Sequence, residues 1–250
     1  MTSTCATHQA LARLGRAIYP ARGAFGVPLM VAVLLLCRVT PYTEPWLESA
    51  RCVAGWGLLV MGLFFRVWGV ACWFTRDASG VIGGRRLMTD DGPYAYMRNP
   101  RYFGNLAMGL GCATLAGMGW VIVVYGIIWC AVHFPIMEAE RETLSTRFGE
   151  VYDKYCARVP IFWPRVSRPL NEQVSGLNWS AAVHEETGTL MGWICLGLFV
   201  EAWRVAQLSG AWLGGWRFLV LIPLTVLLCE AVRARVKGQE FKNEDRPNAP

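Results

Sequence analysis

The sequence predicts an all-α fold, a polytopic membrane bundle of about six transmembrane helices. Of its 250 residues, 54% are apolar and only 17% are charged, whereas an ordinary soluble domain is about 25% charged. The apolar residues also gather in stretches close to the roughly 17–25 residues that a helix needs to cross a bilayer. The six stretches are 23–40, 53–75, 102–118, 119–137, 189–208 and 212–232. The alternative, the buried core of a small soluble helical protein, would not need so many.

The first four stretches differ in composition, and each difference has a structural meaning. The first contains Pro28 and is followed by no small-residue cleavage site, so we do not interpret it as a cleavable signal peptide. The third is rich in glycine, which lets neighbouring helices approach closely. Only Gly117-Met118-Gly119 separates the third stretch from the fourth, and so short a connection predicts an antiparallel helical hairpin.

Beyond the fourth stretch the helix is expected to continue outside the membrane, because apolar residues recur there near helical spacing. Gly149 is expected to bend or end this helix. We interpret 166–188 as a polar loop or a short interfacial helix, followed by the fifth and sixth stretches as an appended pair. The predicted domains are a membrane core over 1–168, with its motifs in 55–165, and a region over 169–250 that holds the linker, two appended helices and a basic tail.

Lysine and arginine residues predict the orientation of the bundle. Basic segments lie before the first stretch, between the second and third, after the fourth and after the sixth. With six spans all of these segments fall on one side, which the positive-inside rule makes cytoplasmic. We therefore expect a multi-pass integral membrane protein with both termini in the cytoplasm, and we place Arg51 on the opposite side. The net charge of +6 follows from this topology and does not indicate nucleic-acid binding.

The cysteines and histidines predict no metal site. The nine cysteines are scattered and include no CxxC pair, so neither a zinc site nor a disulfide framework is expected. The run His184-Glu185-Glu186 lacks a second histidine at ligand spacing. His133 lies inside the fourth stretch, and we interpret it as a hydrogen-bonded structural residue.

Two polar segments flank the hairpin, one over 85–105 before the third stretch and one over 137–156 after the fourth. Polar groups near membrane depth are costly, so they indicate a functional site, although interfacial anchoring would also explain the arginines and tyrosines. The hairpin should bring the two segments together. The residues expected to meet are Tyr94, Arg98, Asn99 and Tyr102 of the first segment and Glu138, Glu140 and Glu142 of the second. Because these glutamates are two residues apart, at most one or two of them can point inward.

The sequence GPYAYMRNPRYFGN at 92–105, a helical hairpin, and EAERETLSTRFGEVYDKYCARVP at 138–160 follow one another in the chain. This pattern resembles the integral-membrane methyltransferases related to isoprenylcysteine carboxyl methyltransferase, of which the phospholipid methyltransferases are more distant relatives. The resemblance covers roughly 55–165. It implies an enzyme that binds S-adenosylmethionine in a cytoplasmic pocket between the two segments and methylates a small or lipid-like acceptor at the bilayer.

The resemblance also implies which residues bind the cofactor. Arg86, Leu87, Met88 and Thr89 would supply main-chain contacts, and Tyr94 would pack against the cofactor. Asn99, Pro100, Arg101 and Tyr102 match the His-Pro-x-Tyr segment of the family, and Glu140 matches its cofactor-binding glutamate. No catalytic base is assigned.

The chain departs from the family at three positions. Asn99 replaces the usual histidine and can donate a hydrogen bond, but it cannot act as a base at neutral pH. Arg141 stands where a second glutamate is usual. Ile136 replaces the arginine that meets a prenylcysteine carboxylate, which argues against that acceptor. Without an obvious strong base, the residues favour an acceptor that is already nucleophilic.

Two other functions remain open from the sequence. One is an NADPH-dependent membrane reductase of a related fold. The other is a non-catalytic membrane protein that retains the fold, which the departures at Asn99 and Arg141 would suit. The acceptor and the oligomeric state are not predicted, and the last two helices could either shape the entry of the acceptor or complete the bundle.

Overall fold

The structure is a computed structural model that describes residues 2–21, 39, 41–42, 44–72, 74–76, 82–85, 92–165, 177–211 and 214–244. In chain order the elements are α1 (Thr2–Ile18), η1 (Tyr19–Ala21), α3 (Pro45–Ala71), β1 (Phe74–Arg76), β2 (Ile82–Arg85), η2 (Gly92–Ala95), α4 (Pro100–Ala116), α5 (Gly119–Phe148), α6 (Glu150–Arg158), α7 (Trp179–Ser209) and α8 (Trp216–Glu244). The described fold is therefore helical, as predicted, with one addition. A short antiparallel ladder joins β1 to β2 and pairs Phe74 with Arg85.

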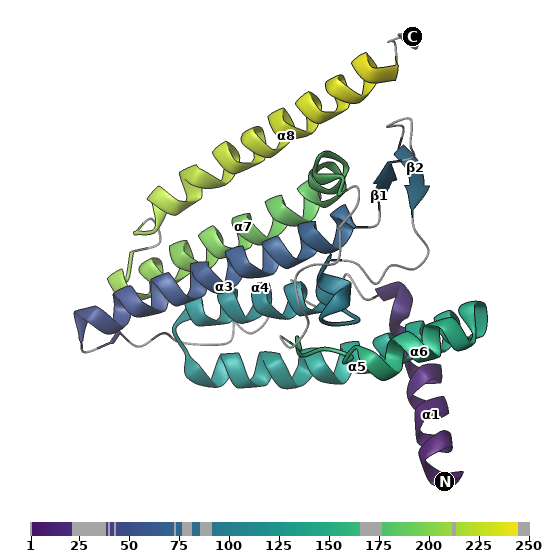
Figure 1. The fold of residues 1–250 in the computed structure, drawn as a ribbon. Coiled ribbons are helices and arrows are strands. Elements are labelled where there is room, and N and C mark those ends of the chain that lie inside the picture. The colour runs from purple at the N-terminus through teal and green to yellow at the C-terminus, as the bar shows by residue number, and fades with distance from the viewer. Residues whose placement is uncertain are drawn as a thin grey trace.

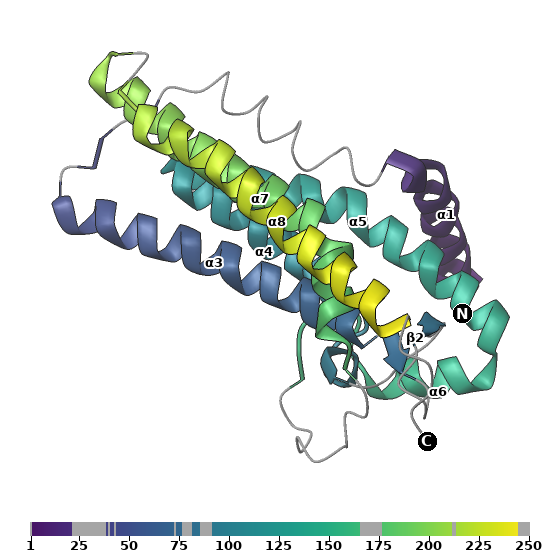
Figure 2. The same ribbon diagram turned by 90° about the horizontal axis from the view of Figure 1, so that it is seen from above.

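The helices α3, α4, α5 and α7 lie side by side and form the bundle (Figure 1). α8 lies along the outer side of α7, and α1 crosses the last turns of α5 (Figure 2). We call the end of the bundle at which α3 finishes and α4 and α7 begin the motif end, because the segment 92–105 lies there. The other end, where α4 meets α5, is called the turn end.

Among the described residues, the helices long and apolar enough to cross a membrane are α3, α5 and α7. They contain most of the predicted spans 53–75, 119–137 and 189–208, which indicates an integral membrane protein. α4 and α8 correspond to the predicted third and sixth spans. Apart from Val39, the predicted span 23–40 lies outside the described residues, so a total of six spans stays a prediction.

The predicted hairpin of the third and fourth stretches is confirmed. α4 ends at Gly117, whose φ of 77° lies in the left-handed region that glycine tolerates best, and whose N–H donates to the Thr114 carbonyl at 2.9 Å. α5 starts two residues later at Gly119. The expected break at Gly149 is also present, with a φ of 55° between α5 and α6.

Glycines bring α3 and α4 into backbone contact. A Cβ atom on Gly104 would lie 2.6 Å from the carbonyl oxygen of Gly62, and one on Gly111 would lie 2.7 Å from that of Gly55. The two contacts are seven residues apart on each helix, so they recur every two turns along the pair. The glycine-rich composition of the third stretch thus serves helix contact, and its partner is α3.

One predicted element is wrong. Residues 179–188 were interpreted as part of a polar loop or short interfacial helix, but they form the first turns of α7. Asn178 caps this helix, because its side-chain oxygen accepts a hydrogen bond from the Ala181 amide at 3.1 Å. The polar residue Glu186 fits inside the bundle because an arginine of α3 pairs with it. The remainder of that prediction, 166–176, lies outside the described residues.

The substitution Gly104→Ala tests the contact between α3 and α4. The new methyl group would meet the Gly62 main chain, so we expect the free energy of unfolding to fall by about 1–3 kcal/mol, as in other overpacked cores. The matched control is Gly57→Ala in α3, because a Cβ atom there has nothing within 4 Å. Thermal midpoints measured in detergent should fall for Gly104→Ala and not for Gly57→Ala; equal midpoints would contradict the close contact.

Candidate functional site

The segment that precedes α4 is held by the chain that follows α6. The Arg98 amide donates to the Pro160 carbonyl at 2.9 Å, and the Arg165 amide donates to the Tyr96 carbonyl at 3.1 Å. The side chain of Asn99 adds a third link, because its Nδ2 donates to the Ile161 carbonyl at 2.9 Å. The two stretches therefore lie side by side at the motif end, and one hydrogen of the Asn99 amide is used in joining them.

The same segment also packs against α6. Tyr94 is buried, and its main-chain carbonyl accepts a hydrogen bond of 2.9 Å from the Tyr155 hydroxyl. Arg98 points towards the same helix, with its Nη1 3.0 Å from the Cys156 sulfur. Burial raises the pKa of both Tyr155 and Tyr152, so both phenols stay protonated, and Tyr155 remains a hydrogen-bond donor, well into the alkaline range.

Tyr102 connects the two polar segments directly. Pro100 opens α4, and two residues later the Tyr102 hydroxyl donates to Glu140 Oε1 of α5 at 2.9 Å. The Tyr102 ring also lies edge-on to the ring of His133, with centroids 5.7 Å apart. His133 itself stacks on Trp129, with centroids 4.3 Å apart, and its Nδ1 lies 3.0 Å from the Trp129 carbonyl. Its interpretation as a hydrogen-bonded residue of the core agrees with these contacts.

The three glutamates of α5 do not all face the first segment. Glu140 does, whereas Glu138 and Glu142 contact α1. Glu138 Oε1 lies 3.0 Å from His8 Nδ1, and Glu142 pairs with Arg16. Successive residues are turned by about 100° around a helix, so carboxylates two positions apart must point in different directions. The expected meeting of all three with the first segment is therefore wrong for Glu138 and Glu142.

Sequence reasoning missed the part that α1 plays here. Arg141, which stands where the family has a second glutamate, donates to Glu138 Oε1 at 2.7 Å and so helps to hold the carboxylate that faces α1. α1 approaches α5 closely enough that a Cβ atom on Gly15 would lie 1.9 Å from the Pro135 carbonyl oxygen. The available signals were the small residues Ala12 and Gly15, which mark the buried side of this helix.

A second charged cluster joins α7 to the start of α4. Glu186 of α7 accepts from Arg66 Nε and Nη2 of α3, each at 2.8 Å, and from Arg101 Nη2 of α4 at 3.0 Å. Arg66 also donates to Asn105 Oδ1 at 2.5 Å. Glu186 is only 1% exposed. The sequence signal was Arg66, a charge inside an apolar stretch, which is costly unless it is paired.

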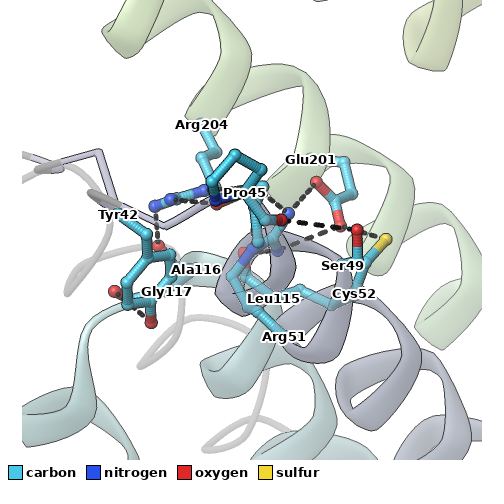
Figure 3. A network of polar contacts seen from close by, with 11 residues as sticks. Tyr42, Pro45, Ser49, Arg51, Cys52, Leu115, Ala116, Gly117, Glu201 and Arg204 are labelled. Atoms are coloured by element: carbon cyan, nitrogen blue, oxygen red, sulfur yellow. Dashed lines mark hydrogen bonds and ion pairs between the residues drawn. The ribbon is translucent and has the colours of Figure 1, made fainter.

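A matching cluster lies at the turn end (Figure 3). Arg51 of α3 donates to Glu201 Oε2 of α7 at 3.0 Å, and Arg204 of α7 donates to Glu48 Oε2 at 2.7 Å. Arg51 is buried, and Glu201 and the Leu115 carbonyl surround its charge. Its predicted place on the side opposite the cytoplasm stays a prediction.

The arginines of this cluster also satisfy the end of α4. Arg51 donates to the Leu115 carbonyl and Arg204 to the Ala116 carbonyl, the latter at 3.2 Å, while the Tyr42 hydroxyl reaches the Gly117 carbonyl at 3.1 Å (Figure 3). The last carbonyls of a helix lack partners within the helix, and cations are favourable there. Sequence reasoning missed this arrangement.

The predicted main-chain contributors Arg86, Leu87, Met88 and Thr89 lie outside the described residues. Of the other predicted cofactor-binding residues, Tyr102 and Glu140 contact each other. Asn99 contacts Ile161 in the segment after α6, and Tyr94 contacts Tyr155 of α6. Arg101 points towards α7, where it pairs with Glu186. Within the described ranges, no three His, Cys, Asp or Glu side chains are grouped in a way that could hold a metal ion.

Part of this chain matches a known protein family and a known protein. Residues 50–151 match the sequence model of the family described as phospholipid methyltransferase, a region that includes most of α3 and all of α4 and α5. The nickel-cobalt-cadmium resistance protein NccN of Alcaligenes xylosoxydans xylosoxydans is 24% identical over 144 residues, which are 56% of this chain. The match spans 63% of the length of that protein. No solved structure matches.

Tyr155→Phe tests how much the buried hydroxyl contributes to the free energy of unfolding and how that contribution depends on pH. The Tyr94 carbonyl loses its donor, so we expect the free energy of unfolding to fall by about 1 kcal/mol at pH 8. Because burial raises the folded pKa of Tyr155 above the unfolded value of about 10, its stabilising effect is present below that pH and is lost as the pH rises further. The loss of thermal midpoint between pH 9 and pH 11 should thus be smaller in the variant than in the wild type. An equal or steeper loss would contradict the buried state of the phenol.

Proposed function

We propose that the chain transfers a methyl group from S-adenosylmethionine to a lipid-like or small-molecule acceptor at the membrane, because residues 50–151 match the phospholipid methyltransferase family. This match, together with the three described helices that are long and apolar enough to cross a bilayer, points to a membrane methyltransferase. The cofactor, the kind of acceptor and the orientation, with the motif end and both termini in the cytoplasm, are parts of the proposal.

The observation that carries the proposal is the hydrogen bond between Tyr102 and Glu140. It joins the two segments that the resemblance assigns to the cofactor, one at the start of α4 and one in the second half of α5. A half-buried carboxylate suits the ammonium group of the cofactor, because charge-assisted hydrogen bonds are the strong ones. A carboxylate can accept several hydrogen bonds, so the Tyr102 hydroxyl and an ammonium can both be served by Glu140.

Other residues of the chain fit the remainder of the cofactor. Aromatic faces attract cations, so the ring of Tyr102 or of Tyr94 suits a sulfonium. An amide nitrogen carries two hydrogens, so Asn99 can hold the Ile161 carbonyl with one and donate to the cofactor carboxylate with the other. We assign Pro100 and Arg101 to the same site through their position in α4, and the stretch 86–89 through the family resemblance.

When bound, S-adenosylmethionine supplies an electrophilic methyl group on a positively charged sulfur. The task of the protein is then to align the acceptor with that methyl group, and alignment of this kind can contribute several kcal/mol. Asn99 cannot remove a proton at neutral pH, and His133 is engaged in the core by Trp129. We therefore expect an acceptor that is nucleophilic when it arrives, such as a carboxylate, a thiolate or a neutral amine.

Glu140→Gln should weaken cofactor binding, because the neutral amide cannot form an ion pair with the ammonium group. Calorimetry in detergent should show a loss of at least tenfold in affinity for S-adenosylmethionine, or about 1.4 kcal/mol. Glu142→Gln is the matched control, since Glu142 is two residues away on the same helix and pairs with Arg16. Unchanged affinity in Glu140→Gln would remove Glu140 from the site.

Incubation of the purified protein with methyl-labelled S-adenosylmethionine and total membrane lipid should yield a labelled lipid, which identifies the acceptor. Cofactor binding without any labelled product, from lipid or from small molecules, would favour a non-catalytic protein. Binding of NADPH in place of S-adenosylmethionine would favour a membrane reductase.

A further inference from the structure

We propose that Glu186 of α7 is a positioning residue for the cofactor-binding end of α4. This inference rests on the proposed function, and it assigns a role to a helix that lies beyond the region matched by the family, residues 50–151. It also answers the question of what the first of the two appended helices does.

The contacts of Glu186 make it the shared partner of two helices. Its Oε1 accepts from Nη2 of both Arg66 and Arg101, while its Oε2 accepts from Nε of Arg66. At 1% exposure the carboxylate has no competing water shell, so its charge acts on these two guanidinium groups. Removal of the charge would leave Arg66 buried without its counter-ion and would remove the ion pair that links Arg101 to Glu186 of α7.

The direction of these contacts fixes α4 about its own axis. Arg101 and Tyr102 are neighbours, so their side chains leave the helix about 100° apart. Arg101 is tied to Glu186 of α7, and Tyr102 is tied to Glu140 of α5. Two contacts in different directions oppose rotation of the first turn of α4.

A second contact extends the same constraint by one turn. Asn105 lies four residues after Arg101, hence on the same face of α4, and its side-chain oxygen accepts from Arg66. Arg66 is itself oriented by its paired bonds to Glu186. Glu186 therefore acts on the start of α4 both directly and through Arg66.

The position of this turn matters for the proposed reaction. Asn99 and Tyr102 flank Arg101 on either side, and both are assigned to the cofactor. A misplacement of about 1 Å in a group that aligns reactants can lower a rate about a hundredfold. Loss of Glu186 should thus weaken cofactor binding although Glu186 is assigned no contact with the cofactor.

A purely structural ion pair would act on stability alone, and the molecule contains a matched example. Glu201 lies fifteen residues further along α7, is also buried, and pairs with Arg51 of α3 as Glu186 pairs with Arg66. Glu201 pairs with Arg51 at the turn end (Figure 3), whereas Asn99 and Tyr102 lie at the start of α4, at the motif end. Glu201→Gln is therefore the control for Glu186→Gln.

The experiment compares the wild type, Glu186→Gln and Glu201→Gln in detergent. We measure the affinity for S-adenosylmethionine by calorimetry and the hydrogen exchange of main-chain amides over 98–105 by mass spectrometry. Both variants should lower the thermal midpoint. Glu186→Gln alone should weaken cofactor affinity by at least fivefold and accelerate exchange over 98–105, whereas Glu201→Gln should keep the wild-type affinity within twofold.

Unchanged affinity and unchanged exchange in Glu186→Gln would overturn the proposal, as would equal losses of affinity in the two variants. If Glu186→Gln does not yield folded protein, the same measurements are made on Glu186→Asp. This variant keeps the charge but is one methylene too short to pair with both arginines. A Glu186→Asp variant with wild-type affinity and exchange would then contradict the positioning role. A wild type that binds no S-adenosylmethionine would refute the proposed function, and the exchange over 98–105 would still test the positioning of α4.

Discussion

The pairing of buried charges between α3 and α7 sets the arrangement of the bundle. Arg51 and Arg66 are fifteen residues apart on α3, and Glu186 and Glu201 are fifteen residues apart on α7. At 1.5 Å per residue both separations are about 22 Å, so the two pairs form together only when the helices run antiparallel in one register. A shift by one residue would separate both pairs, and an unpaired buried charge costs about 3–5 kcal/mol. Buried ion pairs are better at specifying such a register than at adding net stability.

α4 depends on this pairing at both of its ends. At the turn end, Arg51 and Arg204 donate to its last carbonyls, and at the motif end Glu186 holds Arg101. Between these ends, glycines let its backbone touch that of α3. The helix that carries Asn99 and Tyr102 at its start is thus fixed by charge at its ends and by close contact along its length. α7 is consequently part of what positions the candidate site, although the division predicted at residues 168 and 169 separates the two in sequence.

Local signals made much of the fold predictable. Gly117 and Gly149 mark the ends of helices because glycine tolerates positive φ, and both were expected from the sequence. The glycines of the third stretch indicated helix contact, and the tight turn indicated that Tyr102 and Glu140 would come near each other. These features depend on a few neighbouring residues, which is why one sequence was enough to predict them.

The partners of buried charges were not predictable in the same way. Arg66 and Glu186 are 120 residues apart, and no pattern in the chain links them. The charges within apolar stretches did signal that partners must exist, since unpaired charges are costly at that depth. The polar start of α7 is predicted as a polar loop or short interfacial helix, because the sequence does not show that Arg66 and Arg101 pair with Glu186. The packing of α1 on Glu138 and Glu142 was missed because it depends on which sides of α5 remain uncovered.

The pairing of α3 with α7 also bears on how the chain is made. An arginine near the centre of an isolated helix adds about 2.5–3.5 kcal/mol to the free energy of insertion through the translocon. Arg51 and Arg66 lie nearer the ends of α3, which reduces that cost without removing it. Arg51 has a counter-ion, Glu48, in the same helix, whereas the counter-ion of Arg66 is made late, because α7 begins 108 residues after α3 ends (179 − 71). During synthesis α3 must therefore hold the charge of Arg66 without Glu186, and its stable integration is coupled to the later insertion of α7.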